Sequence, residues 1–175
     1  MANKLDVAVA IRSRAWRTSL PEAAAVCRRA ARAALVASRA DLGPGPLEVS
    51  IVLANDELVR ELNRDYRNRD EATNVLSFPA AEPAAGTARG RRADTIPALL
   101  GDVAVAFETA RAEARAEHKP LRHHLAHLVV HGVLHLLGYD HASEVEAEVM
   151  ESLETEVLAG LGIPDPYVPR PRAES

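Results

Sequence analysis

Two histidines four residues apart, followed by a third six residues later, form the most chemically informative pattern in this 175-residue chain: His131, His135 and His141. Side chains four residues apart lie on one face of a helix, about 5–6 Å between their Cβ atoms, so His131 and His135 can bind one metal ion. Gly138 is expected to end that helix in a left-handed turn, which allows His141 to return as a third ligand. Three neutral imidazoles around an open fourth position are typical of a catalytic zinc site, and we predict one Zn²⁺ per chain.

The other histidines carry weaker expectations. His127 lies one turn earlier on the same face of the predicted helix, and we take it as a candidate substrate-binding residue, with support of a ligand and simple packing left open. His118, His123 and His124 are expected at the surface. A structural zinc site usually has four protein ligands that include thiolates, and Cys27 is the only cysteine, so an open site is favoured.

The residue after the first histidine bears on the class of enzyme. The spacing H-x-x-x-H-x-x-G-x-x-H is the metal-binding half of the metzincin protease motif, in which a glutamate directly after the first histidine is the general base. This chain has Gly132 at that position. A peptidase with this site would lack the group that activates its water, so the sequence argues against proteolysis.

A second set of residues is suited to phosphate. Arg60, Arg64 and Arg67 recur at helical spacing, and guanidinium groups bind phosphate through paired hydrogen bonds. Arg60 and Arg64 are candidate substrate-binding residues, with a solvated helix face as the equal alternative. Asp140 is a candidate for proton transfer or for orienting a ligand imidazole, and capping of the following helix is equally open.

The order of the predicted strands and helices indicates an α+β fold. We expect a roughly four-stranded mixed sheet packed against helices, with the histidines on a zincin-like metal-binding helix. Short apolar or alternating runs predict strands at residues 5–11, 47–54, 74–78 and 99–107. Helices are expected at residues 21–38, after the capping residue Asn55, and at 108–117, 120–138 and 143–161. The domain is expected to cover residues 1–163, with a surface loop at 80–97 and a loose tail at 164–175.

Two of these helices have predicted inner faces. In the helix after Asn55, Leu58 and Leu62 are expected to point inward. In the helix at 143–161, the inner face is expected to carry three apolar residues at four-residue steps: Val149, Leu153 and Val157.

Composition limits the possible partners and the compartment. The formal net charge of −4 argues against tight, indiscriminate nucleic-acid binding, and we expect no DNA partner. Six glutamates lie between Glu144 and Glu156; without them the remaining formal charge is +2, so an anionic ligand is not excluded. A single cysteine suits a reducing cytoplasm, and no apolar stretch approaches the ~20 residues of a membrane span, so no membrane partner is expected.

Four segments resemble the YbeY family, bacterial endoribonucleases of ribosomal RNA maturation. They are HGVLHLLGYDH (131–141), LNRDYRNRDEATNVLSFP (62–79), LLGDVAV (99–105) and DPY (165–167). The resemblance extends over nearly the whole chain and implies an α+β fold with zinc held by His131, His135 and His141. It also implies a single-strand-specific endoribonuclease in 16S rRNA 3′-end maturation and ribosome quality control. The implied partners are ribosomal RNA and the small ribosomal subunit with its proteins, and the family's functional arginine falls on Arg67.

The expected chemistry is phosphodiester cleavage. A bound metal would polarise a phosphoryl oxygen and lower the pKa of a bound water towards ~7, while Arg67 would neutralise charge that develops on the phosphate. Asp140 is the second candidate catalytic residue, and the nucleophile, water or the neighbouring ribose 2′-OH, is left open. Two other functions also stay open: a metal-dependent hydrolase of another class, such as a peptidase, and a non-catalytic ribosome-assembly factor with a structural metal.

Overall fold

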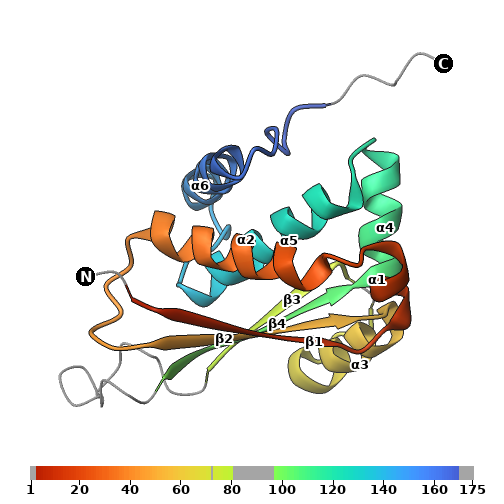
Figure 1. Ribbon diagram of the computed structural model, residues 1–175, viewed down its shortest axis with the longest axis horizontal. Helices are drawn as coiled ribbons and strands as arrows, with labels where there is room; N and C mark the ends of the chain where they lie inside the picture. The colour runs from red at the N-terminus through yellow and green to blue at the C-terminus, as the bar shows by residue number, and fades with distance from the viewer. Residues whose placement is uncertain (1–2, 72, 81–96, 170–175) are drawn as a thin grey trace.

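The computed structural model describes residues 3–71, 73–80 and 97–169 of the chain (Figure 1). The elements of these residues are β1 (Leu5–Ile11), α1 (Arg14–Ser19), α2 (Ala23–Ser38), β2 (Leu47–Ala54), α3 (Asp56–Arg67), β3 (Val75–Pro79), β4 (Ala98–Ala106), α4 (Phe107–Ala116), α5 (Leu121–Leu136) and α6 (Glu144–Gly160). The predicted α+β class, with one four-stranded mixed sheet packed against helices in a single domain, is confirmed. None of the described helices is both long and apolar enough to cross a membrane.

The sheet has the strand order β1-β2-β4-β3. β1, β2 and β4 run parallel, and β3 pairs antiparallel with β4 at one edge. Alternation along β2 sends Leu47, Val49, Ile51 and Leu53 to one face, where all four are buried in the main core. That face is the one the longer helices cover.

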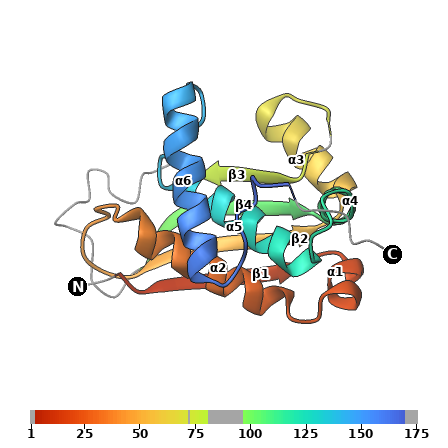
Figure 2. The same ribbon diagram turned by 90° about the horizontal axis from the view of Figure 1, so that it is seen from above.

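The helices form two further layers on this face. α2 and α5 lie side by side on the sheet, and α6 lies over both (Figures 1 and 2). α5 contacts the sheet, α2 and α6, which explains why nine of its sixteen residues are buried. The histidines therefore lie on a helix in the middle layer of the molecule.

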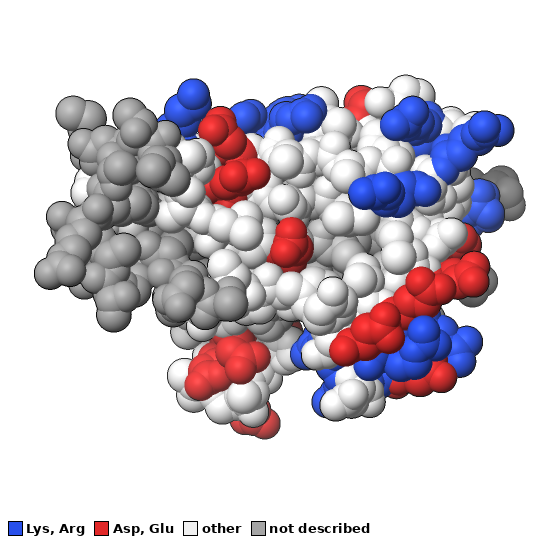
Figure 3. Space-filling view, turned by 90° about the horizontal axis from the view of Figure 1, so that it is seen from below, with Lys and Arg blue, Asp and Glu red and all other residues white. Residues whose placement is uncertain are grey.

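Among the described residues, the helix on the other face of the sheet is α3, which covers part of it. Asn55 starts α3 by accepting a hydrogen bond from the Leu58 backbone at 2.8 Å. Val59 is the fully buried apolar residue of α3, whereas the predicted inner residues Leu58 and Leu62 are only half-buried. The centre of this face carries few charged side chains (Figure 3).

One helix was missing from the sequence-based assignment. α1 has six residues and no side-chain cap, so it is too short to show an apolar period. Its Trp16 is fully buried, and the indole Nε1–H donates to the Ala54 carbonyl at 2.9 Å. Tertiary packing, which the local sequence does not show, therefore stabilises α1.

The predicted inner face of α6 is wrong in part. Val157 is buried as expected, but Val149 is 53% exposed. Met150, Glu154 and Leu158 are buried instead, so a carboxylate occupies the middle of the inner face.

The chain beyond residue 163 also differs from the prediction. Residues 164–169 are not loose, because Lys119 Nζ donates to the Pro166 carbonyl at 3.1 Å and the Tyr167 hydroxyl donates to Glu154. Most of the predicted loop at 80–97 and the end of the predicted tail lie outside the described residues.

Candidate metal centre

The end of α5 brings the three predicted histidines together. Gly138 has φ +100, and the Tyr139 and Gly138 amides donate to the Leu134 and His135 carbonyls at 3.0 and 3.1 Å. These two bonds are the Schellman arrangement that ends helices at a left-handed residue. A Cβ on Gly138 would meet nothing within 4 Å, so the backbone conformation, and not space, is what favours glycine. The reversal places His141 beside the last turn of α5.

The three rings are close enough to share one ion. One ring nitrogen from each of His131, His135 and His141 lies within 4.8 Å of the others. The Nε2 atoms of His131 and His135 are 3.1 Å apart, and nitrogens that bind one tetrahedral zinc at about 2.0–2.1 Å lie about 3.3 Å apart. The donor set therefore fits a metal that imidazole binds. Among the described residues these three are the only cluster of potential ligands of this kind.

The electrostatic environment favours neutral imidazole at the centre. Burial, followed by the nearby His131 and His141, lowers the pKa of His135. A metal binds the unprotonated ring, so this shift lowers the cost of binding near neutral pH.

A cavity of about 600 Å³ opens beside the imidazoles. One wall is the segment between α3 and the end of β3, and the other is the end of α5 with the turn after it. Its lining residues are Arg67, Arg69, Thr73, Asn74, Val75, Ser77, Pro79, His131, His135, Gly138, Tyr139, Asp140 and His141. The cavity thus joins a possible cation site to two guanidinium groups from a distant part of the sequence.

Of the three predicted arginines, only Arg67 reaches this cavity. Arg60 donates from Nε and Nη2 to both carboxylate oxygens of Asp70, at 2.7 and 3.2 Å, and these hydrogen bonds lower the pKa of Asp70. Arg64 donates to Asp65 at 3.5 Å. In the described part of the chain Arg67 forms no ion pair, so its charge is available to a ligand, whereas substrate binding by Arg60 and Arg64 stays a prediction.

The two remaining predicted site residues lie in different surroundings. Asp140 lines the cavity, and its Oδ1 accepts the backbone N–H of His141 at 2.8 Å. It does not cap α6, because Ser143 does so by accepting from the Glu146 amide at 3.2 Å. His127 is not among the cavity-lining residues, and its Nε2 instead contacts Glu154 at 3.0 Å.

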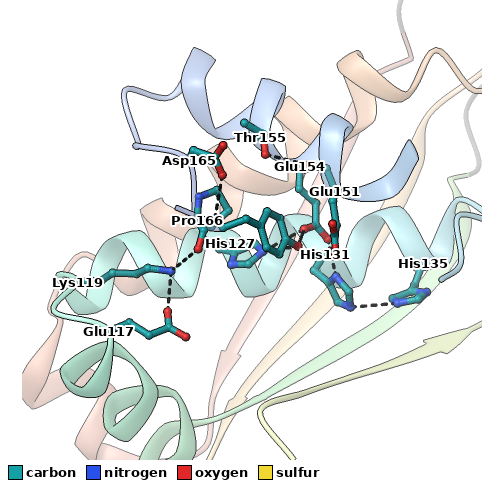
Figure 4. Close-up of polar contacts among 11 residues, drawn as sticks. Glu117, Lys119, His127, His131, His135, Glu151, Glu154, Thr155, Asp165 and Pro166 are labelled. Atoms are coloured by element: carbon teal, nitrogen blue, oxygen red, sulfur yellow. Dashed lines mark hydrogen bonds and ion pairs between the residues drawn. The ribbon is translucent and has the colours of Figure 1, made fainter. Parts of the chain in front are cut away.

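Sequence analysis missed Arg69, which lines the cavity, and it missed Glu154. Its side chain is fully buried on α6, and its two oxygens contact His131 Nδ1 at 2.5 Å and His127 Nε2 at 3.0 Å (Figure 4). Burial would raise the pKa of Glu154, but hydrogen bonds from His127, His131 and Tyr167 outweigh it and lower the pKa to about 2. A signal was present, because Glu154 falls at helical spacing between the apolar residues 150 and 158.

A buried histidine on α5 supports the opposite wall. His124, predicted at the surface, is only 4% exposed, and its Nε2 lies 3.0 Å from Glu113 Oε1. Burial lowers the pKa of His124. The same carboxylate accepts from Asn74 Nδ2 at 3.0 Å, so α4 and α5 together fix the start of β3, where it lines the cavity.

Gly132 packs α5 tightly against the sheet. A Cβ there would lie 2.7 Å from Val103 Cγ1 and 3.2 Å from Ser77 Oγ, and Ser77 Oγ donates to the Gly132 carbonyl at 2.9 Å. Position 132 therefore faces the sheet, and a protease-type glutamate would not fit there without moving the helix.

Comparison with known proteins gives consistent matches. A family model described as Endoribonuclease YbeY matches residues 11–162. Relatives with the name Endoribonuclease YbeY occur in Paramagnetospirillum magneticum, at 50% identity over 95% of this chain and 98% of the relative. Others occur in Azorhizobium caulinodans, at 51% over 93% and 96%, and in Bradyrhizobium sp. strain BTAi1, at 49% over 88% and 88%. A solution structure from Thermotoga maritima aligns over 93% of this chain and 99% of its own, at 21% identity and a TM-score of 0.49.

Proposed function

The chain belongs to the YbeY endoribonuclease family, and on that premise we propose that it is a zinc-dependent endoribonuclease that cuts single-stranded ribosomal RNA. The observation that carries the zinc dependence is the convergence of three imidazoles at one end of a cavity that also contains Arg67. A zinc ion held by His131, His135 and His141 would supply a Lewis acid for a phosphoryl oxygen and lower the pKa of a bound water.

The chain's own residues account for the other requirements of phosphodiester cleavage. Arg67 and Arg69 line the cavity and provide guanidinium groups that hold a phosphate and neutralise charge developing on it. Glu154 holds His131 in one orientation, and Gly138 brings His141 to the site. Asp140 lines the same cavity, at a position from which it can accept or return a proton at the scissile phosphate.

The biological substrate in this proposal is the 3′ end of 16S rRNA. The site would act in the cytoplasm, on the small ribosomal subunit or its precursor, in 3′-end maturation and ribosome quality control. The support for this assignment is family membership together with an open, charged cavity that suits an extended RNA strand.

The direct test is cleavage of a labelled single-stranded RNA by the purified protein, with casein as the competing substrate. We expect RNA to be cut and casein to survive, and we expect cleavage to stop in EDTA and in folded His131→Ala. A 2′,3′-cyclic phosphate end would identify the ribose 2′-OH as the nucleophile. RNA left intact by the zinc-loaded wild type would contradict the proposal, and restored 16S rRNA ends in cells carrying His131→Ala would favour the non-catalytic assembly role.

The phosphate role of Arg67 has its own prediction. Arg67→Glu should slow cleavage by about 10²–10³-fold, the scale of losing one group that stabilises transition-state charge. The matched control is Arg115→Glu, which makes the same charge change at an exposed position on α4, outside the cavity. Equal rates for the two variants, at equal thermal stability, would show that Arg67 does not act on the phosphate.

A further inference from the structure

The strongest unexplained feature is the polar cluster between α5, α6 and the turn at residues 165–167. Glu154 is fully buried there, a position that charged side chains rarely occupy without partners. His127 and His131 direct ring nitrogens at its two oxygens (Figure 4), and the Tyr167 hydroxyl donates to it as well. Of these three partners, only His131 is a predicted metal ligand. The contacts of His127 and Tyr167 with Glu154 therefore need a separate explanation.

The contact with His131 determines which ring nitrogen is free. A carboxylate accepts hydrogen bonds, so His131 Nδ1 carries the proton that it donates to Glu154 Oε1 at 2.5 Å. The lone pair is then on Nε2, which points at His135 and the cavity. Glu154 thus selects one tautomer and one orientation of a predicted ligand.

The turn at residues 165–167 holds Glu154 in turn. The Tyr167 hydroxyl donates to Glu154 Oε2, while its ring stands edge-on to His127 with 5.5 Å between centroids. The turn that carries Tyr167 is closed internally, because Asp165 Oδ1 accepts the Tyr167 amide at 2.8 Å, and it is tied to the residues after α4, because Lys119 Nζ donates to the Pro166 carbonyl at 3.1 Å. Lys119 is itself paired with Glu117 at 2.6 Å.

We propose that Glu154 and Tyr167 are positioning residues of the metal centre, and that the closing turn at residues 165–167 acts as a latch that sets zinc affinity through His131. The inference deepens the proposed function and rests on it for the identity of the ion. Outer partners that fix a ligand imidazole typically change metal affinity by 10–100-fold when they are removed. A segment more than twenty residues beyond the last ligand in sequence thereby becomes part of the site.

The first measurement is the zinc dissociation constant, by competition with a chelating dye. Glu154→Gln should weaken binding by about 10–100-fold. Tyr167→Phe removes only the hydroxyl, and it should weaken binding by about fivefold, the scale of one ordinary hydrogen bond. Tyr66→Phe is the matched control, because Tyr66 is 73% exposed on α3 and its ring packs on Phe78. It should bind zinc as wild type does.

The second measurement separates positioning from stability. Long-range ¹H–¹⁵N correlation spectra of the metal-free protein report the tautomer of each histidine. We expect His131 to be protonated at Nδ1 in wild type and in Tyr66→Phe, to lose that preference in Glu154→Gln, and to show a mixture in Tyr167→Phe. Should Glu154→Gln fail to fold, Tyr167→Phe carries the test alone.

The outcomes divide cleanly. Wild-type zinc affinity in Tyr167→Phe would overturn the latch, and weaker binding with an unchanged His131 tautomer would show a merely structural role and overturn the positioning mechanism. A wild-type protein that binds no zinc would count against the proposed function, whereas the tautomer experiment, which needs no metal, would still decide whether Glu154 and Tyr167 orient His131.

Discussion

Among single residues, His135 carries the most direct test of the metal centre. Its Nε2 lies 3.1 Å from that of His131, so its loss removes one of two ligands from the same helix face. His135→Ala should reduce bound zinc from one equivalent per chain to an undetectable level, measured by elemental analysis after dialysis. His118→Asn is the control, because His118 is exposed with φ +55, a conformation that asparagine tolerates. Zinc retained at full stoichiometry by His135→Ala would refute the ligand assignment.

Residues of the site differ in how far the sequence could predict them. His131, His135 and Gly138 belong to one helix and its end, so local periodicity and turn chemistry were sufficient to place them together. Glu154 and Tyr167 join the cluster only through the packing of α6 and the closing turn on α5. Helical spacing with residues 150 and 158 places Glu154 on the inner face of α6, but it does not show which side chains of α5 or of residues 165–167 meet the carboxylate there.

At the scale of elements, the spacing between α5 and the sheet depends on Gly132. Gly132→Ala would put a methyl group 2.7 Å from Val103 Cγ1, on a branched side chain that cannot move aside cheaply. Overpacking of this kind costs about 1–3 kcal/mol, and the gain in helix propensity is about 1 kcal/mol. We therefore expect Gly132→Ala to lower the free energy of unfolding by up to about 2 kcal/mol, measured by urea denaturation.

The matched control for that change is another helical glycine. A Cβ at Gly160, the last residue of α6, would meet nothing within 4 Å. Gly160→Ala should therefore leave stability unchanged or raise it slightly. A Gly132→Ala variant as stable as Gly160→Ala would mean that α5 can lift from the sheet at little cost.

Elements also show where prediction from sequence fails. The strands were placed within one residue of their observed ends, because alternation along β2 and the apolar runs of β1 and β4 are local signals. The inner face of α6 is predicted only in part: Val157 is buried and Leu153 packs on the core, but Val149 is exposed, and counting apolar residues alone excludes Glu154. The buried carboxylate of Glu154 interrupts the apolar pattern of this face. Prediction from apolar spacing is expected to fail at such positions, where a polar residue is kept for function.

At the scale of the whole molecule, the stacking of the sheet, the α2–α5 layer and α6 explains why the histidine cavity lies at one end of the sheet. The middle layer presents α5, α6 lies over it, and the segment from α3 to β3 approaches from the far edge (Figure 2). Cavity walls from residues 67–69, 73–79 and 131–141 can therefore keep their relative positions only while the whole core is folded. Cys27 offers a probe of that core, because it lies on α2, is fully buried in the main cluster and is the single cysteine of the chain.

Burial raises the pKa of the Cys27 thiol from 9.0 to about 12, and only the thiolate reacts readily. The pKa of Cys27 is higher in the folded protein than in the unfolded chain, so folding favours the protonated thiol. The stability that the buried thiol contributes is complete below pH 9, and it is lost as pH rises from 9 towards 12. We expect Cys27 to resist Ellman's reagent at pH 8, and its reaction rate to rise with urea along the same slope as global unfolding followed by circular dichroism. A reaction rate that does not depend on urea would instead show that α2 opens locally without global unfolding. The cavity walls could then move while most of the core stays folded.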